Sequence, residues 1–143
     1  MTNKMTDSDD LGELEKIVEL DTLVKSVHWE IFGTPEYTGG VPGPTDFVTL
    51  IAEVPRLDQV SFERRSKAGV IWIAPEAARP WISSENRSML AKYRNSTVDL
   101  SILRNCRLAS GKLKKTGQKV DGFVCNNSTK AFIYLILLDP STS

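Results

Sequence analysis

The sequence predicts an α+β fold in a single domain, with a largely antiparallel sheet of five to six strands and two main helices. Its 143 residues match the usual size of one domain, so we expect one domain over residues 1–143. Three strand-like segments near the C-terminus follow one another with only short turns between them, which indicates antiparallel hairpins. Two helical segments precede them, one near the N-terminus and one over 84–94.

The N-terminal helix is predicted from Asp10 to Leu23. Its apolar residues recur at three- and four-residue spacing and form one stripe along the helix. Asp10 followed by Glu13 resembles a capping box, and acids in the first turns suit the positive end of the helix dipole. The residues of the stripe are Leu14, Ile17, Val18, Leu20, Leu23 and Val24. The polar ends of the chain, 1–9 and 140–143, are expected to be disordered tails.

Residues 26–32 are predicted to form a strand, because Val27, Trp29 and Ile31 alternate with other residues. The same apolar residues also continue the helical stripe, but the abundance of β-branched and aromatic side chains favours the strand. Residues 33–44 contain four glycines and three prolines, so they are expected to form a loop.

The middle of the chain is expected to contain both strands and helices. The expected elements are a strand over 47–54, a short helix within 56–67, a strand over 70–74 and the second main helix over 84–94. Pro55 and Pro75 end the two strands, because proline cannot donate a hydrogen bond to the sheet. Ser83 or Ser84 is expected to cap the second main helix.

Three strands are predicted at the C-terminal end, over 105–113, 119–125 and 130–138. Gly117 in the first connection and Asn127 in the second suit tight turns. The third strand is apolar from Ala131 onward apart from the Tyr134 hydroxyl, so both of its faces must be covered and we expect it to lie centrally. One face is expected to present Ile133, Leu135 and Leu137, and the other Phe132, Tyr134 and Ile136.

The two cysteines are predicted to lie opposite each other. If the first of these hairpins turns about Lys115 and Thr116, Cys106 faces Cys125, or lies one step away if Gly117 forms a bulge. A disulfide is then geometrically feasible. However, the chain begins without the cationic start and apolar run of a secretory signal, and no apolar run approaches the ~20 residues of a membrane span. We therefore expect a cytoplasmic protein, not attached to a membrane, whose two thiols are reduced.

The charges of the chain are divided along its length. Residues 1–60 hold twelve acids and four bases, a net charge of −8, and residues 61–143 hold six acids and fourteen bases, a net charge of +8. Three interpretations follow. In the first, the two halves pack against each other within one chain; in the second, they pair between copies of the chain; in the third, the basic half binds an anionic partner.

The strongest indication of a partner is a run of six bases within sixteen residues that contain no acid. These bases are Arg104, Arg107, Lys112, Lys114, Lys115 and Lys119. An acidic protein or a second copy of the chain is the expected partner, although lysines at a turn also serve simply to keep it soluble. Nucleic acid is not favoured, because no aromatic residue is interleaved with these bases before Phe123 and the pI is near neutral. Trp81, directly after Pro80, is a candidate interface anchor.

The best acid–base candidate is formed by His28, Glu30 and Asp46. A strand places His28 and Glu30 on one face, where carboxylate and imidazole could share a proton, and Asp46 begins the expected partner strand. Polar residues also occupy such positions on any half-exposed strand, so a solvent-facing or structural role is the alternative. Neither cysteine has a second cysteine or a histidine close in sequence, and the glycine-rich segment 39–44 lacks the ending of a phosphate-binding loop, so neither a metal nor a cofactor is predicted.

These observations favour a small non-enzymatic interaction protein, with a homodimer as one form of assembly. The first alternative is a small-molecule-binding protein or an enzyme with a pocket in a curved sheet. Such a pocket would be lined by Trp29, Phe47 and Tyr134, with His28 and Asp46 at its mouth. The second alternative is a nucleic-acid-binding accessory protein that uses the basic cluster.

Overall fold

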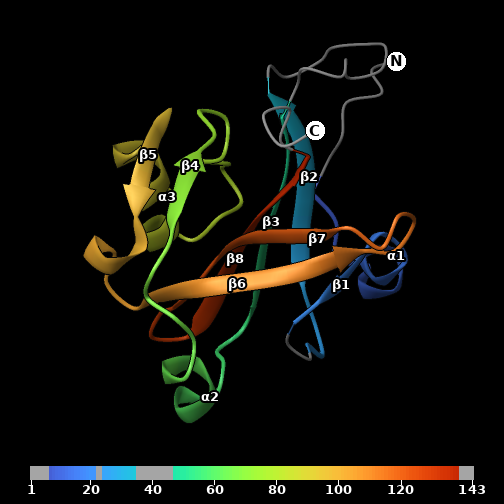
Figure 1. Ribbon diagram of the computed structural model, residues 1–143, viewed down its shortest axis with the longest axis horizontal. Helices are drawn as coiled ribbons and strands as arrows, with labels where there is room; N and C mark the ends of the chain where they lie inside the picture. The colour runs from blue at the N-terminus through green and yellow to red at the C-terminus, as the bar shows by residue number, and fades with distance from the viewer. Residues whose placement is uncertain (1–6, 22–23, 35–46, 139–143) are drawn as a thin grey trace.

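Six antiparallel strands form one curled sheet in the order β1-β6-β7-β8-β3-β2. The computed structural model describes residues 7–21, 24–34 and 47–138. The strands are β1 (Val18–Leu20), β2 (His28–Thr34), β3 (Phe47–Pro55), β6 (Cys106–Leu113), β7 (Lys119–Asn126) and β8 (Lys130–Leu138). Figure 1 shows β6 and β7 running across the view while β2 runs nearly at right angles to them, so the sheet turns strongly from one edge to the other.

The remaining elements pack around this sheet. They are α1 (Leu11–Ile17), α2 (Gln59–Glu63), β4 (Val70–Ile73), α3 (Ser84–Lys92), β5 (Ser96–Asp99) and the 3-10 turn η1 (Leu100–Ile102). Strands β4 and β5 form a separate two-stranded sheet and lie together with α3 on the same side of the molecule (Figure 1). The α+β prediction is therefore confirmed, with a second small sheet that the sequence did not predict.

Strand β8 lies inside the six-stranded sheet, between β7 and β3, as its apolar composition predicted. Ile133, Leu135 and Leu137 belong to a core on one face, which Leu14 of α1 and Phe62 of α2 complete. The core on the other face contains Phe132 and Tyr134, together with Ile136, which is partly buried; Ile73 of β4 and Leu90 of α3 pack against them. Because both faces are covered, β8 can be apolar at almost every position.

The N-terminal helix is shorter than predicted. Asp10 caps it by accepting a hydrogen bond from the backbone N–H of Glu13 at 3.0 Å, as expected. The helix ends at Ile17 because the next residues pair with β6, Val18 facing Leu113. The N–H and C=O groups of residues 18–20 that face β6 are satisfied by pairing with it as well as they would be by another helical turn. The apolar stripe is compatible with both, so it could not locate the end of the helix.

Most of the other predicted elements are confirmed, with ends within a few residues. Residues 26–32 were correctly assigned to a strand, which β2 forms over His28–Thr34. Strand β5 was not predicted: Asn95, with a φ of 55°, reverses the chain after α3, and the next residues pair with β4. Strand β4 was predicted, but it pairs with β5 and not with the main sheet.

The register of the β6–β7 hairpin is the predicted one, with Cys106 directly opposite Cys125 and no bulge at that position. The two sulfurs are joined in a disulfide. The expectation of reduced thiols, which depended on the expected cytoplasmic location, is therefore wrong for this structure. None of the helices in the described part of the chain is long and apolar enough to cross a membrane.

Candidate functional site

The six bases of the predicted cluster do not form one surface. Arg104 lies exposed just before β6, at the end of the hairpin that is remote from its turn. Arg107 is partly buried: its guanidinium carbon lies 5.0 Å from the centroid of the Phe62 ring, and it donates a hydrogen bond to the backbone carbonyl of Cys106 at 3.1 Å. Arg107 therefore has a structural role, and its assignment as a partner-binding residue is not supported by its contacts.

The other four bases gather at the opposite end of the hairpin, and we call them the lysine tip. The lysine tip consists of Lys112, Lys114, Lys115 and Lys119, all exposed. Lys112 and Lys119 are direct cross-strand partners, and the other two lie in the turn between them. The turn closes with a hydrogen bond from the Gly117 N–H to the Leu113 carbonyl at 2.8 Å, and Gly117 has a φ of 75°.

Positive charge is only partly compensated at the lysine tip. Like charges directly opposite each other on neighbouring strands are destabilising, so the Lys112–Lys119 pair costs some stability. Glu19 of β1 is the other cross-strand partner of Lys112. Within the described part of the chain, the one ion pair made by the lysine tip joins Lys119 to Asp121 at 3.9 Å, between two exposed side chains. Such a pair contributes little, which leaves the tip available to an external anion.

A groove of about 410 Å³ begins beside the lysine tip. It lies between β4–β5 and the strands β7 and β8, and we call it the β4 groove. Its described lining residues are Val70, Ile71, Trp72, Thr97, Gln118, Lys119, Val120, Asp121, Ile136 and Leu137. Val70 is 63% exposed although it is apolar. The Trp72 ring is covered on one side by Phe47, with ring centroids 4.4 Å apart.

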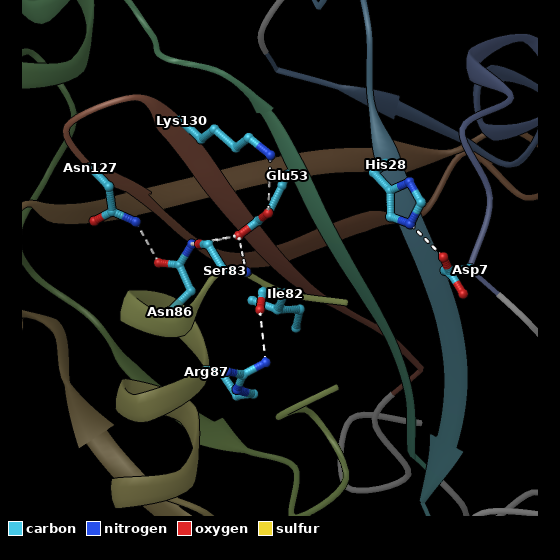
Figure 2. A network of polar contacts seen from close by, with 9 residues as sticks. All are labelled: Asp7, His28, Glu53, Ile82, Ser83, Asn86, Arg87, Asn127 and Lys130. Atoms are coloured by element: carbon cyan, nitrogen blue, oxygen red, sulfur yellow. Dashed lines mark hydrogen bonds and ion pairs between the residues drawn. The ribbon is translucent and has the colours of Figure 1, made fainter. Parts of the chain in front are cut away.

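The acid–base candidate does not assemble as predicted. His28 pairs with Asp7, Nε2 to Oδ2 at 2.5 Å, and its ring meets the Trp81 ring edge-on with centroids 4.5 Å apart. Figure 2 shows the His28 side chain directed toward Asp7 and away from the Glu53 network. Asp46, the third member of the candidate, lies outside the described residues.

Glu30 makes no hydrogen bond to His28 in this structure; it binds Trp81 and Arg79, and its contact with Trp81 explains the position of that ring. Glu30 is only 5% exposed, accepts a hydrogen bond from the indole N–H of Trp81 at 2.8 Å, and pairs with Arg79 at 3.1 Å. Trp81 is partly buried and has one edge bonded to Glu30, so it holds the segment before α3 against β2. These contacts give Trp81 a structural role, and its role as a partly exposed interface anchor stays a prediction.

A second buried carboxylate, Glu53 in β3, forms a polar network that sequence reasoning missed. One oxygen of Glu53 accepts hydrogen bonds from the Ser83 N–H at 3.0 Å, the Ser83 hydroxyl at 2.6 Å and the Asn86 amide at 2.8 Å. The other oxygen lies 3.8 Å from the ammonium group of Lys130. Figure 2 shows these groups converging between β3, β8 and the start of α3. The signal available in the sequence was Glu53 itself, a charged residue in a strand that is otherwise apolar apart from Thr49.

The network explains how α3 is attached. Ser83 is the N-cap residue, but its side chain makes no capping hydrogen bond. Its hydroxyl donates to Glu53 and accepts a hydrogen bond from the Asn86 amide at 3.1 Å. Asn86 continues the network, accepting a hydrogen bond from the Asn127 amide at 2.5 Å. The polar side chains of this network are therefore mutually satisfied, as buried polar groups must be, and the network is structural.

A larger groove, of about 560 Å³, lies between α3 and the open end of the β6–β7 hairpin. Both disulfide cysteines line it, together with Arg104, Lys92 and the network residue Asn86. The only charged residues among its described lining are these two bases and the acid Glu85. The polar side chain that is buried there, Asn86, already has its partners, so the groove presents no unsatisfied buried group to a ligand.

The pocket expected in the curved sheet does not form from the predicted residues. Trp29 belongs to the core on one face of the sheet and Tyr134 to the core on the other, so they cannot line one cavity. The indole N–H of Trp29 donates to the Asp10 carbonyl at 3.0 Å. Within residues 7–21, 24–34 and 47–138, no group of three or more His, Cys, Asp or Glu side chains is arranged to hold a metal ion.

Comparison of the chain with protein-family models, curated protein sequences and solved structures finds no match to any of them.

Proposed function

We propose that this protein is a small non-enzymatic interaction protein that binds an acidic protein partner through the lysine tip. The observation that carries the proposal is the direct opposition of Lys112 and Lys119, with two further exposed lysines between them. An acidic partner would relieve the repulsion between these cations, and complementary charge also speeds association and selects partners.

The hydrogen bonds made by the buried carboxylates Glu30 and Glu53 support an interaction role over an enzymatic one. Glu30 and Glu53 are the two buried carboxylates among the described residues, and both have hydrogen-bonded partners that hold secondary-structure elements together. A general base needs a free position next to the substrate, which the contacts of Glu30 and Glu53 do not offer. His28 contacts Asp7 and Trp81 and keeps 41% of its side chain exposed, so only the two buried carboxylates count against an enzymatic role.

The unequal charge of the two halves of the sequence is partly neutralised within the chain, which limits the surface that is left for a partner. Among the residues that the structure describes, three ion pairs join acids of the first sixty residues to bases of the remainder: Asp21 with Arg65, Glu30 with Arg79, and Glu53 with Lys130. Part of the charge division is thus used inside the molecule, which favours the interpretation that the halves pack against each other. Other exposed bases of this half are scattered, whereas the lysine tip gathers four of them in one place. We therefore assign the external partner, whether another protein or a second copy, to the tip.

The disulfide argues against the cytoplasmic location expected from the sequence. Cytosolic proteins rarely keep disulfides, because glutathione and thioredoxin reduce them, whereas oxidising compartments preserve them. A location where the Cys106–Cys125 bond persists therefore fits the structure better than the cytoplasm does.

The experiment is a binding titration with a fluorescein-labelled poly-glutamate peptide, followed by fluorescence anisotropy at ~50 mM salt. We expect binding that weakens as salt rises, since exposed charges are screened beyond about 8 Å at 0.15 M. Replacing all four lysines of the tip with glutamine should weaken binding by about tenfold or more. No binding by the unaltered protein at low salt would refute the proposal.

A matched control separates the tip from net charge. The control variant replaces four exposed bases elsewhere with glutamine, namely Lys25, Arg64, Lys67 and Arg94. Both variants have the same net charge, so a purely non-specific attraction would weaken equally in both. We expect the control to bind within about twofold of the unaltered protein, and an equal loss in both variants would contradict the proposal.

A further inference from the structure

The lysine tip and the β4 groove are continuous, because Lys119 belongs to both. Gln118, just before β7, and Asp121 on β7 extend the same wall of the groove, and Val70 and Trp72 of β4 form the facing wall. A partner bound to the lysine tip therefore has an apolar recess immediately beside its acidic residues.

We propose that the β4 groove receives a large apolar side chain of the acidic partner, so that the recognised segment combines acidic residues with an adjacent aromatic or aliphatic one. This inference rests on the proposed function, since it describes the same partner at the same site. Two features of the groove, its charge and its exposed apolar side chains, lead to this occupant.

The charge of the groove matches an acidic segment. The one acid among its described lining residues is Asp121, which is paired with Lys119 at 3.9 Å. Lys112 lies directly across the hairpin from Lys119, so the mouth of the groove next to the tip carries more positive than negative charge. An acidic segment that approaches the tip is attracted there, and an acidic side chain is less favoured farther in, beside Asp121.

The apolar side chains that line the β4 groove favour an apolar side chain of the partner. Val70 is 63% exposed, and Ile136 is only partly buried although it lies on a central strand. Covering apolar surface contributes roughly 25 cal/mol per Å², so an inserted apolar side chain gains affinity that glutamates alone cannot provide. The volume of about 410 Å³ lies within the range of about 300–1,000 Å³ that is typical of ligand pockets.

The hydrogen bonds of β4 show how the occupant can enter. On the side of β4 that faces away from β5, the Trp72 carbonyl accepts a hydrogen bond from the Tyr134 hydroxyl at 2.8 Å. The N–H of Ala74, the residue after β4, donates a hydrogen bond to the same hydroxyl, also at 2.8 Å. These backbone groups are therefore not available to an added strand. The partner inserts a side chain between β4 and β7 and does not extend the small sheet.

The test compares two fluorescein-labelled peptides by anisotropy. One contains glutamates flanking a central tryptophan, and the other has serine in place of the tryptophan. We expect the tryptophan peptide to bind at least about fivefold more tightly. Val70→Ser should reduce this preference to less than about twofold, whereas Val60→Ser, which changes a valine that is 58% exposed on α2, should leave it unchanged.

The possible outcomes separate this inference from the proposed function. If both peptides bind equally and binding still requires the lysine tip, the proposed function holds and the groove inference is wrong. If neither peptide binds, both are wrong. Tryptophan-dependent binding that survives loss of the four lysines, or tighter binding of a single-stranded DNA oligonucleotide of equal charge, also overturns both.

A second measurement locates the bound side chain. In a ¹H–¹⁵N correlation spectrum, the tryptophan peptide should shift the backbone signals of Val70, Trp72 and Gln118 in addition to those of the lysine tip. The serine peptide should shift the tip signals alone. Shifts confined to the tip with both peptides would overturn the groove inference, and the spectrum also verifies that each variant is folded.

Discussion

The hydroxyl of Tyr134 donates a hydrogen bond to the backbone carbonyl of Trp72 across 2.8 Å, and this bond ties the six-stranded sheet to the small β4–β5 sheet. The same hydroxyl accepts a hydrogen bond from the Ala74 N–H, also at 2.8 Å. Tyr134 is fully buried in the middle of β8. One phenol oxygen therefore satisfies two backbone groups on the side of β4 that faces away from β5.

Tyr134→Phe should destabilise the protein by about 1–3 kcal/mol. The change keeps the ring and its packing but leaves the partly buried Trp72 carbonyl and the buried Ala74 N–H without their partner, and such unsatisfied groups carry a cost of this size. The free energy of unfolding from urea titrations is the measurement. Tyr93→Phe, at the partly buried tyrosine that caps the C-terminal end of α3, serves as the control. Equal effects of the two changes would contradict this role for Tyr134.

The same hydroxyl predicts a loss of stability at alkaline pH. Burial raises the pKa of Tyr134 well above the value of an exposed tyrosine, so the folded state holds this proton more tightly than the unfolded state. The contribution is fully present below the unfolded pKa of about 10 and is lost as pH rises above it. Urea titrations between pH 9 and 11 should show a steeper fall for the unaltered protein than for Tyr134→Phe. Parallel curves would refute the prediction.

Leu135→Ala should cost about 2–5 kcal/mol, as truncation of a buried leucine does. Leu135 has no exposed surface and lies in the core that α1 and α2 cover. Thermal and urea unfolding give the value. A loss below ~0.5 kcal/mol would be incompatible with a central position for β8.

Glu53→Ala should detach the start of α3 and cost about 3 kcal/mol, because three donors lose a charged acceptor in a buried place. Glu53→Gln should cost less, since its amide oxygen can still accept. Hydrogen exchange of the α3 amides, with urea unfolding, measures both effects. Glu85→Ala, at an exposed glutamate in the first turn of the same helix, should change stability by less than ~0.5 kcal/mol. Exchange of α3 that stays equally slow in Glu53→Ala would argue against the anchoring role.

Self-association, if the acidic and basic faces of two copies meet, should weaken with salt. Light scattering across a salt series from about 0.02 to 0.5 M measures this, because the range of exposed charges shortens as salt rises. The four-lysine variant of the tip should associate less than the matched control. A strict monomer at low salt and high protein concentration would exclude the homodimer and leave a different acidic protein as the partner.

Local patterns in the sequence determined the C-terminal half of the main sheet. Turn chemistry around Gly117 limited the hairpin to two neighbouring registers, because a short turn leaves few pairings open. The structure has the one that places Cys106 directly opposite Cys125. The apolar composition of 130–138 placed β8 centrally and divided its side chains between the two cores, because period-two alternation depends only on the strand itself.

Only the tertiary structure decided which distant residues meet. In the folded chain, Asp7 pairs with His28, Glu30 accepts a hydrogen bond from Trp81, and Glu53 binds the start of α3. The tertiary structure also removed Arg107 from the basic cluster, because the Arg107 guanidinium lies over the ring of Phe62 in α2, far away in the sequence. The sequence indicates which charged and polar groups need hydrogen-bonding partners if they are buried. Which residue becomes the partner depends on how the sheets and helices pack, and this packing is a property of the whole fold.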